Sequence, residues 1–121
     1  MRMIEKILVV EDHSDTRDGL AKILELEGYV IVTAEDGREG LKIAQEESPN
    51  LILTDVMMPN MDGIEMIKLI REQSRFSRTP IMVLSAYIDK ASDAMKAGAN
   101  SVLPKPVDAN LLIRNIDRLL A

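Results

Sequence analysis

The chain has 121 residues, a formal net charge of -5 and no cysteine. This length fits one domain, and a composition of 46% apolar and 29% charged residues is typical of a globular chain rather than a disordered or collagen-like one. The acidic balance, without a run of lysine or arginine, argues against nucleic-acid binding, and the lack of cysteine excludes disulfide frameworks and thiolate zinc sites. We expect one domain over residues 1–121.

The first residues, MRMIEKILVVED, hold only four consecutive apolar residues before two acids. That run is too short for a signal peptide or a membrane span. We therefore expect a cytoplasmic chain that does not associate with a membrane.

The first half of the chain alternates short apolar runs with amphipathic segments. In chain order it predicts a strand over 6–10, a helix, a strand over 29–34, a helix from about Asp36 to just before Pro49, and a strand over 50–54. Ser14 or Asp15 can cap the first helix, and Gly28 supplies the left-handed residue that ends it. The runs at 6–10 and 50–54 are apolar throughout, which is typical of parallel strands covered on both faces.

The second half continues this alternation. In chain order it predicts a helix with Ile64, Ile67 and Ile70 on one face, a strand over 80–84, a helix over 89–98, a strand over 100–103, and a helix that starts at an Asp108 cap. Gly98 ends the fourth helix, and Leu112, Ile116 and Leu119 form the inner face of the fifth.

Strict alternation of five strands with five helices and short connections predicts a parallel sheet with right-handed crossovers. At this length we expect an α/β doubly wound open sheet in the flavodoxin-like order 2-1-3-4-5, with helices on both faces. Ligands of such sheets bind beyond the carboxyl ends of the strands, near the point where the strand order reverses. Here that point lies between the first and third strands.

Polar side chains stand at these strand ends: Glu11, Asp12, Asp55, Ser85 and Lys105. Each alone is ordinary as a helix cap, a turn residue or a solvated lysine, but turn chemistry seldom places all five at one edge. Three carboxylates repel each other by ~4 kcal/mol per pair at ~4 Å and an effective dielectric of about 20, so they need a cation. Oxygen ligands in an incomplete site favour Mg²⁺ together with phosphate oxygens.

Five short motifs occur in order: VVED at 9–12, TDVMMPNMDG at 54–63, LSA at 84–86, AGA at 97–99 and LPKP at 103–106. Through them the chain closely resembles the receiver domains of two-component response regulators, from Lys6 to about Leu120. The resemblance implies a phosphoacceptor signalling domain that switches conformation to control a partner or output domain. It implies a sensor histidine kinase or a histidine phosphotransfer protein as the phosphoryl donor.

The resemblance also implies roles around a bound Mg²⁺ ion. Asp55 would be the phosphoacceptor, attacking a phosphohistidine to form an acyl phosphate. Asp12 and Asp55 would bind Mg²⁺ directly, Glu11 would bind it directly or through water, and the backbone carbonyl of Met57 would add a further ligand.

Further roles follow from the same resemblance. Ser85 and Lys105 would each contact the phosphoryl oxygens, and the peptide bond before Pro106 would be cis. The chain would catalyse only its own phosphorylation and dephosphorylation, so it would not be a turnover enzyme. An unidentified output partner would bind the face formed by the fourth helix, the fifth strand and the fifth helix.

Some positions depart from the family pattern. The family usually carries an aromatic residue three positions before the site lysine, where this chain has Val102. The segment 85–98 is about two residues shorter than usual, which would trim the loop or the first turn of the fourth helix. Met57 and Tyr87 occupy positions that flank the path of the hydrolytic water in the family. Because neither is a good base, we expect a long-lived phosphoryl group.

Two other residues invite a metal-ligand interpretation that we do not adopt. His13, the single histidine, follows the acid pair, but one imidazole among hard oxygen ligands is better interpreted as a solvated loop residue. Met66 lies in a methionine-rich stretch, yet its helical spacing indicates packing rather than ligation.

Three alternative functions are weighed against phosphotransfer. An enzyme of the haloacid-dehalogenase type would need a second aspartate at position 57, which is methionine. A receiver fold that docks without phosphorylation would not need the acid pair together with Asp55, Ser85 and Lys105. The chain is also compatible with the receiver of a longer regulator that has a DNA-binding or enzymatic output domain.

Overall fold

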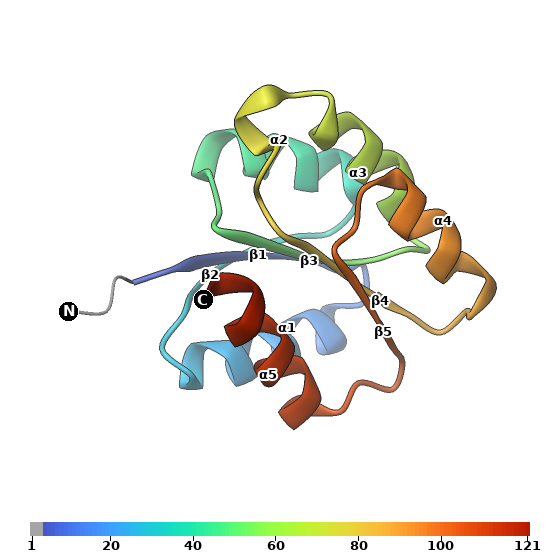
Figure 1. Cartoon of the computed structure of the whole chain (residues 1–121). Helices are drawn as coiled ribbons and strands as arrows, with labels where there is room; N and C mark the ends of the chain where they lie inside the picture. The colour runs from blue at the N-terminus through green and yellow to red at the C-terminus, as the bar shows by residue number, and fades with distance from the viewer. Residues whose placement is uncertain (1–3) are drawn as a thin grey trace.

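The computed structural model describes residues 4–121, so residues 1–3 of the expected domain lie outside the described part. Figure 1 shows one sheet between two layers of helices. The strands are β1 (Lys6–Val10), β2 (Val30–Ala34), β3 (Leu51–Asp55), β4 (Ile81–Ser85) and β5 (Ser101–Pro104). The helices are α1 (Ser14–Leu26), α2 (Gly37–Glu47), α3 (Gly63–Arg71), α4 (Asp89–Ala97) and α5 (Ala109–Leu120).

All strand pairs are parallel, and the strands follow the order β2-β1-β3-β4-β5. The predicted fold class and strand order are therefore confirmed. Three strands, β3, β4 and β5, extend one residue past their predicted ends, because the β-ladder continues past the apolar run. Asp55 pairs with Leu84, and Ser85 pairs with Pro104, so both polar residues belong to their strands.

Helices cover both faces of the sheet, as predicted. Helices α2, α3 and α4 lie on one face, and α1 and α5 lie on the other (Figure 1). Alternate residues of β1 enter the two separate cores, with Leu8 on the α2–α3–α4 side and Ile7 on the α1–α5 side. Because both faces are buried, the central strands are apolar throughout rather than alternating. Met66 is fully buried in the first core, which confirms that it serves packing.

The helix ends follow the predicted chemistry with one exception. The Asp108 side chain accepts backbone N–H groups at the start of α5, as predicted, and Asp36 and Asp62, which were not predicted as caps, do the same at α2 and α3. Gly28 and Gly98 have φ angles of 95° and 126°, the left-handed region that glycine tolerates.

The exception is the start of α1, where the predicted Ser14 or Asp15 cap was wrong. His13 is the N-cap, with extended backbone, and its carbonyl accepts the Arg17 N–H at 2.9 Å. Ser14 already belongs to the helix. A 3-10 turn over Ser74–Phe76, between α3 and β4, was not predicted. Within residues 4–121, no helix has the length and apolar character needed to cross a membrane.

Candidate functional site at the strand ends

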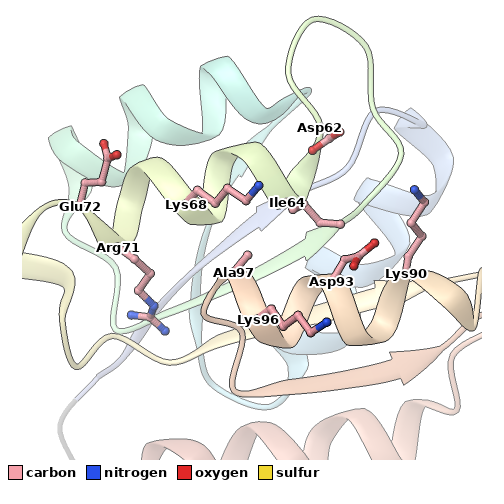
Figure 2. A pocket seen from close by; sticks show the side chains of 9 residues that line it. All are labelled: Asp62, Ile64, Lys68, Arg71, Glu72, Lys90, Asp93, Lys96 and Ala97. Carbon is pink, nitrogen blue, oxygen red and sulfur yellow. The ribbon is translucent and has the colours of Figure 1, made fainter.

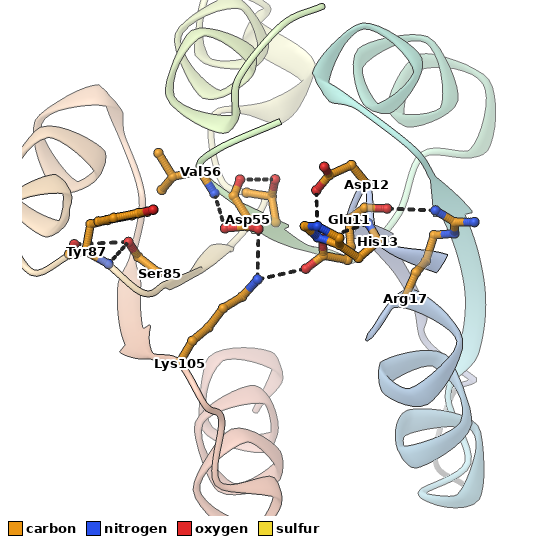
Figure 3. Close-up of polar contacts among 10 residues, drawn as sticks. Glu11, Asp12, His13, Arg17, Asp55, Val56, Ser85, Tyr87 and Lys105 are labelled. Atoms are coloured by element: carbon orange, nitrogen blue, oxygen red, sulfur yellow. Dashed lines mark hydrogen bonds and ion pairs between the residues drawn. The ribbon is translucent and has the colours of Figure 1, made fainter. Parts of the chain in front are cut away.

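Lys105 joins the ends of three strands in one ionic cluster. Its Nζ donates to Glu11 Oε1 at 2.9 Å and to Asp55 Oδ2 at 2.8 Å, as Figure 3 shows. Glu11 follows β1, Asp55 ends β3, and Lys105 follows β5, with a cis peptide bond to Pro106. The structure therefore brings together Glu11, Asp55 and Lys105, and it contains the cis bond that the resemblance implied.

The Asp55 carboxylate has a separate donor for each oxygen. Oδ1 accepts the Val56 backbone N–H at 2.7 Å, while Oδ2 accepts from Lys105. The backbone behind it is closely packed, since the Gly63 N–H donates to the Val56 carbonyl at 2.8 Å. A methyl group at Gly63 would overlap the Asp55 carbonyl oxygen. Asp55 is thus buried and held in place, with its carboxylate at the edge of the sheet.

Burial and pairing set opposite pKa shifts on the acid pair. Burial acts to raise the pKa of Glu11, but hydrogen bonds from Lys105 and from the His13 backbone N–H outweigh it and leave that pKa below its usual value. Burial and the neighbouring Glu11 carboxyl raise the pKa of Asp12. For Lys105, burial acts to lower the pKa, whereas its bonds to Asp55 and Glu11 raise it above the ordinary value.

Asp12 has an oxygen that the protein leaves unsatisfied. Its Oδ1 atom is buried and forms no hydrogen bond within residues 4–121. An unsatisfied buried acceptor costs free energy, and a cation beside it would remove that cost. Together with the raised pKa of Asp12, this atom indicates that the donor set fits a hard cation.

His13 lies against the acid pair, although most of its side chain is exposed. The ring is 74% exposed, which agrees with a solvated loop residue. Its Nδ1 atom nevertheless lies 3.3 Å from Glu11 Oε2 and 3.4 Å from Asp12 Oδ1 (Figure 3). Glu11, Asp12 and His13 thus offer ligand atoms within 4.8 Å of one another. Sequence reasoning missed this contact, because the spacing of residues does not specify the orientation of the ring.

Ser85 faces its own loop rather than Asp55. Its hydroxyl donates to the Tyr87 carbonyl and accepts the Tyr87 N–H, each at 3.0 Å. Within residues 4–121, the hydroxyl forms no hydrogen bond with Asp55 or Lys105, although the Lys105 backbone N–H donates to the Ser85 carbonyl at 3.0 Å. Met57 is about half exposed beside the site. The structure therefore assembles the acidic and lysine groups but leaves the serine hydroxyl apart from them.

An apolar cavity of about 180 Å³ lies beside Ser85. It is lined by Ser85, Tyr87, Ile88, Ala91, Val102 and Pro104. Val102 is the position at which the sequence departs from the family aromatic, so the small valine side chain borders this space.

A larger groove of about 680 Å³ lies elsewhere, between α3 and α4 (Figure 2). It is lined by Asp62, Ile64, Lys68, Arg71, Glu72, Lys90, Asp93, Lys96 and Ala97. This groove contains none of the residues predicted for phosphoryl or metal chemistry. The strand-end cluster is therefore the better candidate for the site.

Comparison with known proteins identifies the family of the chain. The chain matches the family model described as response regulator receiver domain over residues 7–117. It is 40% identical over 114 residues to an uncharacterized 14.6 kDa protein in the sodA1 3′ region of Leptolyngbya boryana, covering 93% of this chain and 87% of that protein. It is 41% identical to the alkaline phosphatase synthesis transcriptional regulatory protein PhoP of Bacillus subtilis, covering 86% of this chain and 43% of PhoP.

Solved structures give the same likeness. The chemotaxis response regulator CheY4 of Vibrio cholerae superposes with a TM-score of 0.92 at 35% identity, covering 98% of this chain and 100% of CheY4. Several curated relatives are longer, since the chain spans only 24% to 50% of the length of three of them.

Proposed function

Because the chain belongs to the response-regulator receiver family, and is therefore a phosphoacceptor signalling domain, we propose that Asp55 is the residue that accepts the phosphoryl group. The observation that carries this proposal is the Lys105 bridge between Asp55 and Glu11, beside the unsatisfied oxygen of Asp12. The cluster combines a fixed carboxylate, a cation and an acid pair at one sheet edge.

The proposed step is an in-line displacement at phosphorus. A carboxylate oxygen of Asp55 forms the new O–P bond as the N–P bond of a phosphohistidine breaks, and the departing imidazole keeps the bonding electrons and takes a proton. Lys105 neutralises charge on the acceptor before the reaction and on the phosphoryl oxygens after it. The Val56 N–H holds the other carboxylate oxygen and so orients the group.

Receiver domains bind Mg²⁺ at an acidic pocket, and the donors here fit that ion. We propose Asp12, Asp55 and the Met57 carbonyl as its direct ligands, with Glu11 directly or through water. When bound, Mg²⁺ would neutralise the carboxylates and the phosphoryl oxygens. Asp12 contributes the buried oxygen that has no partner in the described chain. The three carboxylates carry a charge of -3, which Lys105 alone does not balance.

We further propose that Ser85 couples phosphorylation to signalling. To reach a phosphoryl oxygen, its hydroxyl must release the Tyr87 carbonyl, which it binds at 3.0 Å. That release would shift the population toward a second state of the loop before α4. The face formed by α4, β5 and α5 would then bind the output partner. Membership in the family implies a histidine kinase or phosphotransfer protein as donor.

We propose that residues 1–121 form one receiver domain in the cytoplasm. The chain would catalyse only its own phosphorylation and dephosphorylation. The docking-only alternative remains a distinct proposal, which predicts the same fold without any phosphoryl transfer.

Intact-mass spectrometry tests the acceptor directly. Incubation with Mg²⁺ and acetyl phosphate should add one phosphoryl group to the natural chain and none to Asp55→Asn. Asp62→Asn is the matched control, because Asp62 is an exposed acid that caps α3 in the loop after β3, and it should leave the mass increment intact. An increment on Asp55→Asn equal to that of the natural chain would refute Asp55 as acceptor. No increment on any variant would favour docking alone.

A further inference from the structure

The imidazole of His13 and the acid pair form a group of nitrogen and oxygen donors that phosphoryl transfer does not require. Nδ1 of His13 lies 3.3 Å from Glu11 Oε2 and 3.4 Å from Asp12 Oδ1. Figure 3 shows the ring beside both carboxylates, while the Lys105 ammonium approaches Glu11 through its other oxygen, Oε1. The lysine therefore does not occupy Glu11 Oε2 or Asp12 Oδ1, although Oε2 also accepts the His13 backbone N–H at 3.1 Å.

The two distances from His13 Nδ1 match those between ligands that share one metal ion, and all three residues offer ligand atoms within 4.8 Å of one another. Ligand atoms about 2.1 Å from an ion are about 3.0 Å apart at octahedral angles and about 3.4 Å apart at tetrahedral angles. Both nitrogen-to-oxygen distances approach the tetrahedral value. Asp12 Oδ1 adds a second observation, since it is buried and unsatisfied within the described residues and also lies on the side facing His13.

We propose that His13 Nδ1 is a metal ligand together with Glu11 and Asp12, and that it gives the acid pair a preference for first-row transition cations over Mg²⁺. Imidazole nitrogen binds Co²⁺, Ni²⁺ and Zn²⁺ well, whereas Mg²⁺ prefers oxygen ligands. The proposal rests on the cation role given to the acid pair under the proposed function. It does not depend on phosphorylation of Asp55.

The competing explanation is an ordinary hydrogen bond. A proton on Nδ1 would make His13 a donor to Glu11 Oε2 at the same 3.3 Å distance, with no metal involved. Metal binding instead needs Nδ1 without its proton, with the proton on Nε2 of this largely exposed ring. The two explanations differ in whether replacing His13 changes metal selectivity.

The composition limits which side chains can cause a preference for transition metals. His13 is the single histidine of the chain, and there is no cysteine. Imidazole, thiolate and thioether are the side-chain ligands that favour transition metals over Mg²⁺, and of these imidazole is the nitrogen ligand. In an untagged protein, any such preference that depends on an imidazole must therefore come from His13.

The experiment is calorimetric titration of the untagged chain at pH 8 with Co²⁺ and, separately, with Mg²⁺, without a phosphoryl donor. We expect His13→Gln to weaken Co²⁺ binding at least tenfold while changing Mg²⁺ binding less than twofold. Asp12→Asn should weaken the binding of both ions. The visible absorption of bound Co²⁺ should also change in His13→Gln, and a denaturation curve checks that the variant is folded.

Two outcomes would overturn the proposal. One is Co²⁺ affinity and absorption that His13→Gln leaves unchanged, which would make the ring a hydrogen-bond donor only. The other is an equal loss of affinity for Co²⁺ and Mg²⁺, which would mean that His13 merely positions the acids. Because no phosphoryl donor is present, a failure of Asp55 phosphorylation would leave this result readable.

Discussion

Two parts of the strand-end site differ in how far the fold has assembled them. Glu11, Asp55 and Lys105 hold one another through bonds of 2.8 and 2.9 Å that link β1, β3 and β5. The Ser85 hydroxyl, at the end of β4, bonds only to the backbone of Tyr87, two residues away. The first part, which we call the charged part, joins two buried carboxylates to the partly exposed Lys105 ammonium. The second, the serine part, borders a cavity and an exposed loop.

The difference between the two parts indicates which groups are already in contact before phosphorylation. The charged part brings the proposed acceptor, Asp55, and a compensating cation together before any phosphoryl group arrives, so the proposed chemistry needs little rearrangement. In the proposed function, the Ser85 hydroxyl must break its bonds to Tyr87 before it can contact a phosphoryl oxygen. A receiver arranged in this way can separate the acceptance of a phosphoryl group from the response to it.

The largest effect should follow from removing the cation of the charged part. Lys105→Met leaves the Glu11 carboxylate buried without its partner, and breaking such a pair costs about 3 kcal/mol of unfolding free energy. Urea denaturation at pH 7 with a metal chelator measures the loss. The matched control is Lys6→Met, which removes a 2.9 Å pair with Glu47 that is more exposed and should cost under about 1 kcal/mol.

The stability lost in Lys105→Met should depend on pH. Because the pKa of Glu11 is lowered by folding, Glu11 stabilises the folded state at pH values above its ordinary pKa of 4.5. This stabilisation is lost as the pH falls through the pKa in the folded state. Because the pKa of Lys105 is raised by folding, Lys105 stabilises the folded state at pH values below its ordinary pKa of 10.5. This stabilisation is lost as the pH rises through the pKa in the folded state. The loss of unfolding free energy in Lys105→Met should therefore be smaller at pH 3 than at pH 7. A deficit that is equal at pH 3 and pH 7 would show that lost packing, not charge, causes it.

The backbone under Asp55 should also tolerate little change. Gly63→Ala would place a methyl group against the Asp55 carbonyl oxygen, and we expect this overlap to cost about 2 kcal/mol. Gly19→Ala is the matched control, because Gly19 lies within α1 with no atom near its added methyl group. That variant should gain about 0.5 to 1 kcal/mol from helix propensity. Chemical denaturation of both variants measures the difference, and similar stabilities would contradict the close packing.

The sequence predicted the elements well because their signals are local. Runs of apolar residues mark strands that are buried on both faces, and Asp108 marks the start of α5. The strand ends were less certain, since the β-ladder extends over Asp55 and Ser85 on account of pairing with neighbours rather than side-chain type. At α1, Ser14 and Asp15 were plausible caps, but the chain turns one residue earlier.

The candidate site was predictable as a set of residues but not as a set of contacts. The topology of a parallel sheet brings the ends of β1, β3 and β5 together, so the grouping of Glu11, Asp55 and Lys105 follows from strand order. Side-chain orientation does not follow from it. The bonds of Ser85 to Tyr87 and the contact of His13 with the acids depend on loop geometry and rotamers that spacing leaves open.

The lifetime of the phosphoryl group should depend on the two side chains beside the site. Met57 cannot orient water, and Tyr87 is half exposed next to Ser85, where its ring can occupy space that water needs. If they raise the barrier to hydrolysis by ~1.4 kcal/mol, the phosphorylated state lasts about tenfold longer than with polar residues there.

Decay of phosphorylated protein after removal of the donor measures this lifetime. The natural chain should be compared with Met57→Asn, Tyr87→Glu and the double substitution, which should decay fastest. If all four rates agree within twofold, these side chains do not control hydrolysis, and Tyr87 simply points to solvent.

The smallest effect concerns the cavity of the serine part. Val102→Leu would place one more methylene toward a space of about 180 Å³, and burying it should stabilise the fold by about 0.8 kcal/mol. Val30→Leu is the control, because Val30 lies exposed on the edge strand β2 and should change stability little. Overpacking would instead make Val102→Leu less stable than the natural chain.

Filling the cavity should also reduce the response to phosphorylation. Beryllofluoride, a phosphoryl mimic, should change amide exchange over residues 86–110 in the natural chain, because Ser85 must leave Tyr87 and loosen the loop before α4. With less space to rearrange beside Ser85, Val102→Leu should show a smaller change than Val30→Leu. Identical exchange with and without the mimic in the natural chain would mean that the serine part does not move. Equal changes in both variants would mean that it moves without using the cavity.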